Sequence, residues 1–205
     1  MNEPEKYILK GSKDAFISVV GCGGTGGYVA EGLCRLLVGA KNSIYLTDFD
    51  RVEERNIGRQ NYYQEDLGRF KAEVLAERLA RQFGRIIHYT VSPIEQMALE
   101  ERSDITIGCV DNPEARGRLQ WAGSRMMAGR YSYQQFGGWY IDAGNSENTG
   151  QVLIGNSLLR ELNQSFMPET GLCSKLPLPT IQQPGLLAPA PNIDRERRVQ
   201  ELTVH

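Results

Sequence analysis

A glycine-rich segment near the N-terminus carries the first chemical signal in this sequence. Gly21, Gly23 and Gly26 fit the pattern GxGxxG, and Gly24 adds another glycine between them. Glycines permit a tight turn and let the backbone approach a phosphate, and the helix that follows presents free N–H groups and a partial positive charge. We therefore expect a nucleotide-binding turn here. The alternative is that these glycines only pack a helix onto a strand.

Two acidic residues follow the next apolar segment. Asp48 and Asp50 flank Phe49, and Asp48 lies 22 residues after Gly26. An acid at this spacing hydrogen-bonds the ribose of a bound nucleotide. The glycine pattern and Asp48 together predict nucleotide binding, but they do not separate NAD from ATP, because one fold can serve both ligands.

Polar residues farther along the chain bear on that choice. Asn56 and Arg59 lie in the segment NIGRQ, Lys71 opens a helical pattern, and Asp111-Asn112 closes an apolar run. Each also has an ordinary explanation. Lys71 would lie on the solvated face of an amphipathic helix, and Asp111-Asn112 before a proline is a good helix start.

The hydrophobic pattern predicts the elements that must position these residues. Apolar runs predict buried strands over 16–20, 43–49, 86–91 and 104–110. Helical spacing predicts helices over 28–38, 67–83 and 112–127, the second ending at Gly84. Two short runs around a polar loop predict an antiparallel edge hairpin from 140–143 and 151–154. The fold class is therefore α/β, a Rossmann-like and mostly parallel sheet with helices on both faces and antiparallel edge strands.

Composition excludes several classes of protein. The chain has 205 residues, a net charge of −2 and 23% charged residues. This charge gives no field that would hold nucleic acid, no apolar run is long enough to span a bilayer, and the first eleven residues are unlike a signal peptide. No cysteine sits in a CxxC pair. We expect a cytoplasmic protein without nucleic-acid or membrane partners.

Taken together, these motifs resemble the ThiF/MoeB family, which is related to the ubiquitin-activating enzymes. The match covers roughly residues 12–155: GxGGxG, DFD, NxxRQ, a lysine a dozen residues on, DN, and then Ile141 to Gly144 followed by Gly150 to Val152. The resemblance implies that ATP and Mg²⁺ are used to adenylate the C-terminal carboxylate of a small ubiquitin-like or sulfur-carrier protein that ends in glycine. A homodimer is implied as well, and no structural zinc is expected because the family's CxxC pairs are missing.

The resemblance also implies residue roles. Arg59 and Lys71 would hold the phosphates with help from Asn56. Asp48 would bind the ribose and Asp50 would support the loop. Asp111, next to Asn112, would hold Mg²⁺ or orient the incoming carboxylate. The nucleophile is already an anion, so no general base is required.

The C-terminal part departs from the family pattern. Residues 1–166 are expected to form the Rossmann-like, ATP-binding adenylation domain, and residues 167–205 a proline-rich crossing loop or tail. The six prolines from Pro168 to Pro191 exclude a regular helix or central strand from that stretch, and a charged helix is expected to begin over 194–204. The short end is consistent with a truncated chain. Cys173, near Lys175, is a candidate nucleophile for accepting the activated carboxylate, and the alternative is an exposed, inert thiol.

Two other functions stay open on the sequence. An NAD(P)-dependent oxidoreductase would share the glycine turn, but it would give Arg59 and Lys71 no common task. A family member that binds nucleotide but has lost transfer chemistry is the other alternative.

Overall fold

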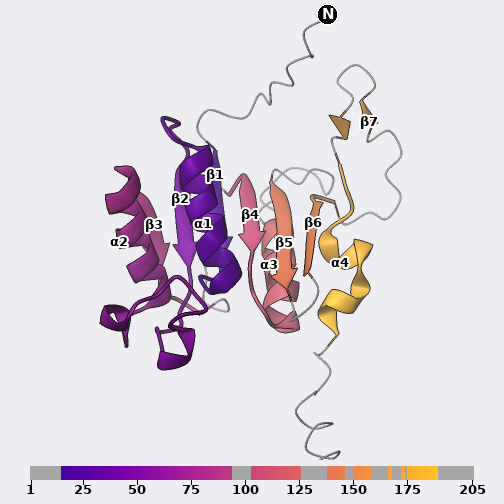
Figure 1. Ribbon diagram of the computed structural model, residues 1–205. Coiled ribbons are helices and arrows are strands. Elements are labelled where there is room, and N and C mark those ends of the chain that lie inside the picture. The colour runs from indigo at the N-terminus through magenta and orange to yellow at the C-terminus, as the bar shows by residue number, and fades with distance from the viewer. Residues whose placement is uncertain are drawn as a thin grey trace, which may run out of the picture.

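The computed structural model contains an α/β domain built on one six-stranded sheet (Figure 1). The structure describes residues 15–93, 103–125, 138–145, 150–157, 166–167, 172–173 and 175–188. The expected charged helix over 194–204 lies outside these residues. Within the described part, no helix has the length and apolar character needed to span a bilayer.

The strands of the sheet follow the order β3-β2-β1-β4-β5-β6. The first five are parallel, and β6 runs antiparallel to β5 at the edge. Their bounds are β1 Phe16–Val20, β2 Ser43–Thr47, β3 Ile87–Thr90, β4 Ile105–Gly108, β5 Trp139–Asn145 and β6 Gly150–Gly155. The predicted fold class, including the edge hairpin, is confirmed.

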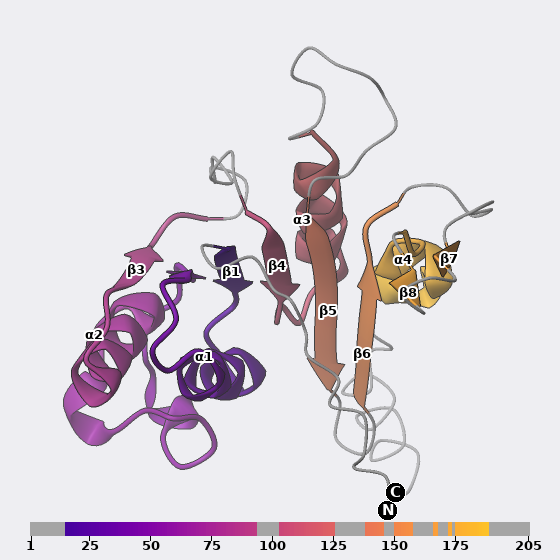
Figure 2. The same ribbon diagram turned by 90° about the horizontal axis from the view of Figure 1, so that it is seen from above.

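Among the described residues, three long helices cover the sheet. They are α1 Gly24–Leu36, α2 Lys71–Phe83 and α3 Pro113–Arg125. Figure 2 shows α1 and α2 on one face and α3 on the other. One core lies under α1 and α2, where Ile44, Leu46, Leu75 and Leu79 are fully buried, and a second lies under α3 around Leu119 and Tyr140.

The start of α2 differs from the prediction. The pattern placed it at Leu67, but the helix begins at Lys71. Gly68 has a φ of +78°, a left-handed conformation that interrupts the helix, and Phe70 is extended and bridges to Arg51. A short 3₁₀ turn, η2 (Gln64–Asp66), occupies the preceding residues instead. Gly84 ends α2 at a φ of +61°, as predicted.

The segment after β6 contains more regular structure than its prolines suggest. Residues 166–167 (β7) and 172–173 (β8) pair with each other, and Pro179–Gln182 forms one helical turn, α4, followed by the 3₁₀ turn η3, Pro184–Leu187. Proline fits the first turn of a helix because it needs no N–H partner there. Leu178 and Leu186 are buried, and Leu178 packs into the core beneath α3. Part of the predicted tail is therefore docked on the domain.

The strand order creates one crevice that is set by topology. The chain runs from β1 outward through β2 to β3 and then returns to the other side of β1 as β4. Connections therefore diverge above the carboxyl ends of β1 and β4. Open α/β sheets bind their ligands at such a point.

Candidate functional site

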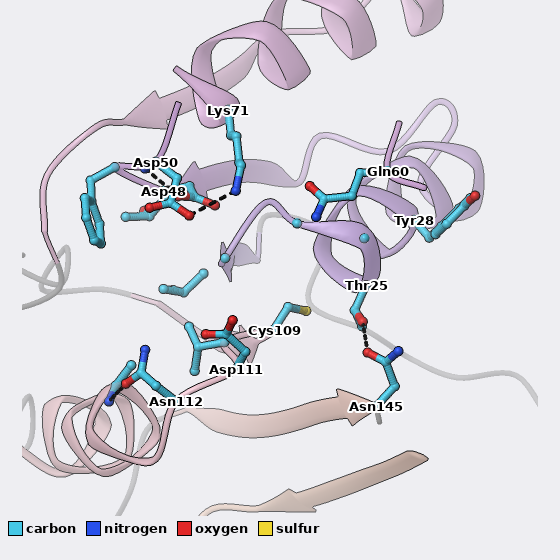
Figure 3. A pocket seen from close by; sticks show the side chains of 18 of the residues that line it. Thr25, Tyr28, Asp48, Asp50, Gln60, Lys71, Cys109, Asp111, Asn112 and Asn145 are labelled. Carbon is cyan, nitrogen blue, oxygen red and sulfur yellow. Dashed lines mark hydrogen bonds and ion pairs between the residues drawn. The ribbon is translucent and has the colours of Figure 1, made fainter. Parts of the chain in front are cut away.

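A cavity of about 890 Å³ lies above the carboxyl ends of β1, β2 and β4 (Figure 3). It collects side chains from the glycine turn, the end of β2, the loop before α2, and the start of α3. Nine of the predicted site residues line it: Gly21, Gly23, Gly24, Asp48, Asp50, Arg59, Lys71, Asp111 and Asn112. These residues lie between positions 21 and 112, a span of 92 positions, and the fold brings them to the same cavity.

The glycine turn is fixed by close backbone contacts. Gly21 has a φ of +90°, and a Cβ atom there would lie 2.6 Å from the carbonyl oxygen of Cys109. A Cβ on Gly26 would lie 1.7 Å from the carbonyl oxygen of Gly21. Gly26 does not line the cavity. It lets the first turn of α1 rest directly on the end of β1.

The N-terminus of α1 faces the cavity and is open. A Cβ on Gly23 or Gly24 would meet nothing closer than 3.9 Å. The first turn of α1 holds no acidic residue that would neutralise the helix dipole. Free N–H groups and a partial positive charge are therefore available to an anion that lies over this turn.

Asp48 ties the glycine turn to the end of β2. Its Oδ2 accepts a hydrogen bond from the N–H of Cys22 at 2.6 Å, and its Oδ1 accepts one from the N–H of Asp50 at 2.8 Å. Burial raises the pKa of this carboxyl, while the two N–H donors lower it. Each carboxylate oxygen has a second lone pair. Asp48 can therefore shape the turn and still accept from a ligand hydroxyl.

Lys71 places its ammonium group beside Asp50. Nζ lies 2.9 Å from Oδ2 of Asp50, on the cavity wall (Figure 3). The start of α2 is held down by Tyr62, whose hydroxyl donates to the carbonyl of Cys22 at 2.6 Å and approaches that of Lys71 at 3.3 Å. Burial raises the pKa of Tyr62, so it remains a donor. Lys71 is thus positioned from both the loop and the glycine turn.

The loop before α2 has a small core of its own. Val52, Tyr62 and Val74 are buried together, with Ile57 and Leu67 packed around them. Arg78 forms an ion pair with Asp66 and donates to the carbonyl of Asn61. These contacts fix the turn that carries Arg59 and Gln60 to the cavity.

Asn56 lies inside this loop and does not line the cavity. It is buried, and its Oδ1 accepts from the N–H of Glu53 at 2.9 Å within the 3₁₀ turn η1, Glu54–Asn56. Its carbonyl accepts from the N–H of Gln60 at 3.0 Å. Asn56 therefore shapes the turn behind Arg59, and its predicted contact with phosphates stays a prediction.

Asp111 and Asn112 stand at the start of α3, across the cavity from Lys71 (Figure 3). The Oδ1 of Asn112 accepts from the N–H of Ala115 at 2.7 Å, which confirms the predicted helix cap. Asp111 is exposed to the cavity. Mg²⁺ in proteins is commonly held by one or two carboxylates together with substrate phosphates, and Asp111 fits that donor set. No group of three or more potential metal ligands occurs among the described residues.

Several cavity residues were not predicted. Thr25 on α1 donates to Oδ1 of Asn145 on β5 at 2.8 Å, and these residues are 120 positions apart, so no local pattern could pair them. Gln60 has a buried Oε1 without a partner in the described part of the chain. Its position next to Arg59 in the sequence was the signal that could have identified Gln60 as a cavity residue. Cys109 also lines the cavity, and burial raises its pKa to about 12.

Cys173 lies away from this cavity. It is exposed on β8 and is not among the lining residues. The two-stranded ribbon that carries it is separate from the main sheet. A role in transfer stays a prediction.

Comparison with known proteins gives a family match. The sequence model described as the ThiF family matches residues 8–160. The tRNA threonylcarbamoyladenosine dehydratase of Escherichia coli K12 is 46% identical over 67 residues, which cover 32% of this chain and 24% of that protein. The ATP-dependent ubiquitin transferase-like protein Cap2 of Escherichia coli TW11681 is 33% identical over 107 residues, covering 50% of this chain and 18% of that protein.

A solved structure shares the fold. The crystal structure of Escherichia coli MccB with succinimide superposes with a TM-score of 0.55 at 21% identity, covering 74% of this chain and 45% of that chain. At this identity the likeness shows the fold alone. The chain spans about a quarter or less of the two protein relatives above.

Proposed function

This chain belongs to the ThiF family, and from that premise we propose that it binds ATP with Mg²⁺ and transfers AMP to a carboxylate, releasing pyrophosphate. One observation carries the proposal. Arg59 and Lys71 reach the same cavity as the open N-terminus of α1 and the carboxylate of Asp111. A phosphate chain could use all of these groups, and the name of the relative Cap2 describes an ATP-dependent protein.

The cavity residues can divide the work of this reaction. The N–H groups at the start of α1 would bind the reacting phosphate, and Asp48 would accept from the ribose hydroxyls. Arg59 and Lys71 would stabilise charge on the departing pyrophosphate. Mg²⁺ held by Asp111 would supply further neutralisation of phosphoryl oxygens.

The oxidoreductase alternative has less support in this geometry. Hydride transfer does not need two cations, Arg59 and Lys71, in the cavity. That alternative predicts a His or Tyr proton donor, and among the described residues that line the cavity there is no histidine and one tyrosine, Tyr28. Thermal unfolding with ATP and Mg²⁺, compared with NAD, separates the two ligands, because a ligand stabilises the state that it binds. Stabilisation by NAD alone would remove our proposal.

We propose a small ubiquitin-like or sulfur-carrier protein ending in glycine as the acceptor. Support comes from the family and from the ubiquitin-transferase-like name of Cap2. A second candidate is a substrate carried on tRNA. The relative named as a tRNA threonylcarbamoyladenosine dehydratase shares 46% identity over its matched segment, although the net charge of −2 favours no nucleic-acid partner.

The test is exchange of labelled pyrophosphate into ATP. We expect exchange that depends on a folded carrier with a C-terminal glycine, and none with the same carrier lacking that glycine. Exchange supported by tRNA instead would favour the second candidate. No exchange with either acceptor, in a protein shown to bind ATP, would favour a family member without transfer chemistry.

The remaining assignments can be tested with the same protein. We propose that residues 1–166 carry adenylation, that 167–205 cross it as an appendage, and that two copies form a homodimer. Cys173→Ala should leave pyrophosphate exchange intact and abolish carrier thioester formation. Unchanged thioester formation would remove Cys173 from the reaction. Light scattering would measure the oligomeric state.

A further inference from the structure

The ion pair between Lys71 and Asp50 is unevenly buried. The side chain of Lys71 is 9% exposed, that of Asp50 is 52% exposed, and Nζ lies 2.9 Å from Oδ2. The ammonium has three donors, and the described residues offer its Nζ one hydrogen-bond acceptor, Asp50. Both side chains line the cavity (Figure 3). The lysine is therefore held by one carboxylate that water and ligands can reach.

A second ion pair nearby shows what a purely structural pair looks like in this chain. Asp66 and Arg78 are 5% and 19% exposed. Asp66 also accepts from the N–H of Tyr63, and Arg78 also donates to the carbonyl of Asn61. Both side chains of that pair are largely buried, and neither lines the cavity. The pair of Lys71 and Asp50 differs because it opens onto the ligand volume.

The charged side chains that line the cavity determine how the pair of Lys71 and Asp50 affects phosphate binding. Its described lining includes two basic side chains, Arg59 and Lys71, and four acidic ones, Asp48, Asp50, Asp111 and Glu114. Arg59 has no ion-pair partner among the described residues, whereas Lys71 is already neutralised by Asp50. A phosphate group that takes Lys71 must therefore compete with Asp50, and after the phosphate leaves, Asp50 can pair with Lys71 again.

We propose that Asp50 is a positioning residue that acts as a displaceable counter-ion for Lys71. In the empty cavity it holds the ammonium in place. When a nucleotide binds, its terminal phosphates displace Asp50 from Lys71. When pyrophosphate has become the leaving product, Asp50 pairs with Lys71 again and displaces the pyrophosphate. Asp50 thereby limits the affinity for terminal phosphates and favours release of pyrophosphate. The proposal rests on the proposed function only in taking ATP as the ligand.

Affinities measured for a series of ligands test this role. Adenosine, ATP and inorganic pyrophosphate would be titrated into the full chain and into Asp50→Asn at a fixed excess of Mg²⁺. We expect ATP and pyrophosphate to bind Asp50→Asn about 3–10-fold more tightly, the range set by partly exposed ion pairs. Adenosine should change less than about twofold, since it cannot reach Lys71 with a charge. Glu65→Gln, which removes the same charge from an exposed residue outside the cavity lining, should change none of the three.

A double-mutant cycle tests whether the effect passes through Lys71. In a Lys71→Gln background, Asp50→Asn should no longer tighten ATP. Asp50→Ser, whose side chain is too short to reach Nζ, should repeat the effect of Asp50→Asn. Equal weakening of adenosine and ATP would show a nucleoside contact and overturn the proposal, as would tightening that persists without Lys71. If the full chain binds ATP but shows no pyrophosphate exchange, the proposed function fails. The double-mutant cycle of Asp50 and Lys71 then still tests the counter-ion role, because it measures only ligand binding. If it binds neither ATP nor pyrophosphate, both fail.

Discussion

Two glycines in helix α1 offer a matched pair for testing how the nucleotide turn is built. At Gly26 an added Cβ would lie 1.7 Å from the carbonyl oxygen of Gly21, and at Gly32 it would meet nothing within 4 Å. Carbon–oxygen contacts normally begin at about 3.3 Å, so Gly26→Ala must move the first turn of α1 by roughly 1.5 Å. The same substitution at Gly32 requires no movement.

The two substitutions should change the free energy of unfolding in opposite directions. Overpacking costs about 1–3 kcal/mol, and the carbonyl oxygen of Gly21 cannot rotate away from the added Cβ, so we expect the free energy of unfolding to fall by about 3 kcal/mol. Gly32→Ala should raise the free energy of unfolding by about 0.5–1 kcal/mol, since alanine is more favourable than glycine at an exposed helix position. With a urea m-value of about 2–3 kcal/mol/M, the Gly26→Ala midpoint should drop by about 1 M.

Urea unfolding followed by circular dichroism would measure both variants, and ATP titration would show whether the turn survives. We expect Gly26→Ala to lose ATP binding and Gly32→Ala to keep it. A Gly26→Ala midpoint at or above that of the unsubstituted chain would refute the argument that direct contact between α1 and the end of β1 requires this glycine.

Other predictions follow from single contacts. Arg59→Met should weaken ATP by about 10–100-fold in calorimetry, the value of a charge-assisted hydrogen bond, while leaving adenosine unchanged; equal loss for both ligands would contradict it. Tyr62→Phe should lower the free energy of unfolding by about 1–2 kcal/mol, because the carbonyl of Cys22 loses its donor; an unchanged urea midpoint would speak against that bond. Iodoacetamide near neutral pH should label the exposed Cys173 well before Cys109, whose pKa burial raises to about 12. Mass spectrometry would read the order, and faster labelling of Cys109 would show that its thiol is not held neutral.

Local patterns predicted the sheet and the glycine turn well. The apolar run Phe16–Val20 is β1 as expected, and the glycines after it form the turn to α1. Both signals are contained in a few adjacent residues. The placement of Asp48 at the end of β2, facing the same cavity, follows because parallel strands bring their carboxyl ends to one edge.

Features that depend on distant contacts were not predictable. The bond between Thr25 and Asn145 joins helix α1 to strand β5, and its geometry exists only after the sheet has formed. The start of α2 was misplaced because Phe70 is held extended beneath the guanidinium of Arg51, 3.8 Å from the ring centre. Helical periodicity contains no information about either contact.

The small core beneath the loop before α2 also affects the thermodynamics of ligand capture. Val52, Tyr62 and Val74 fix the loop when the chain folds, so its conformational freedom is already lost before a nucleotide arrives. Association then does not require an ordering step at Arg59, and most of the favourable contact energy remains available as affinity. A substitution that loosened this core would weaken binding mainly through entropy, although it touched no atom of the ligand.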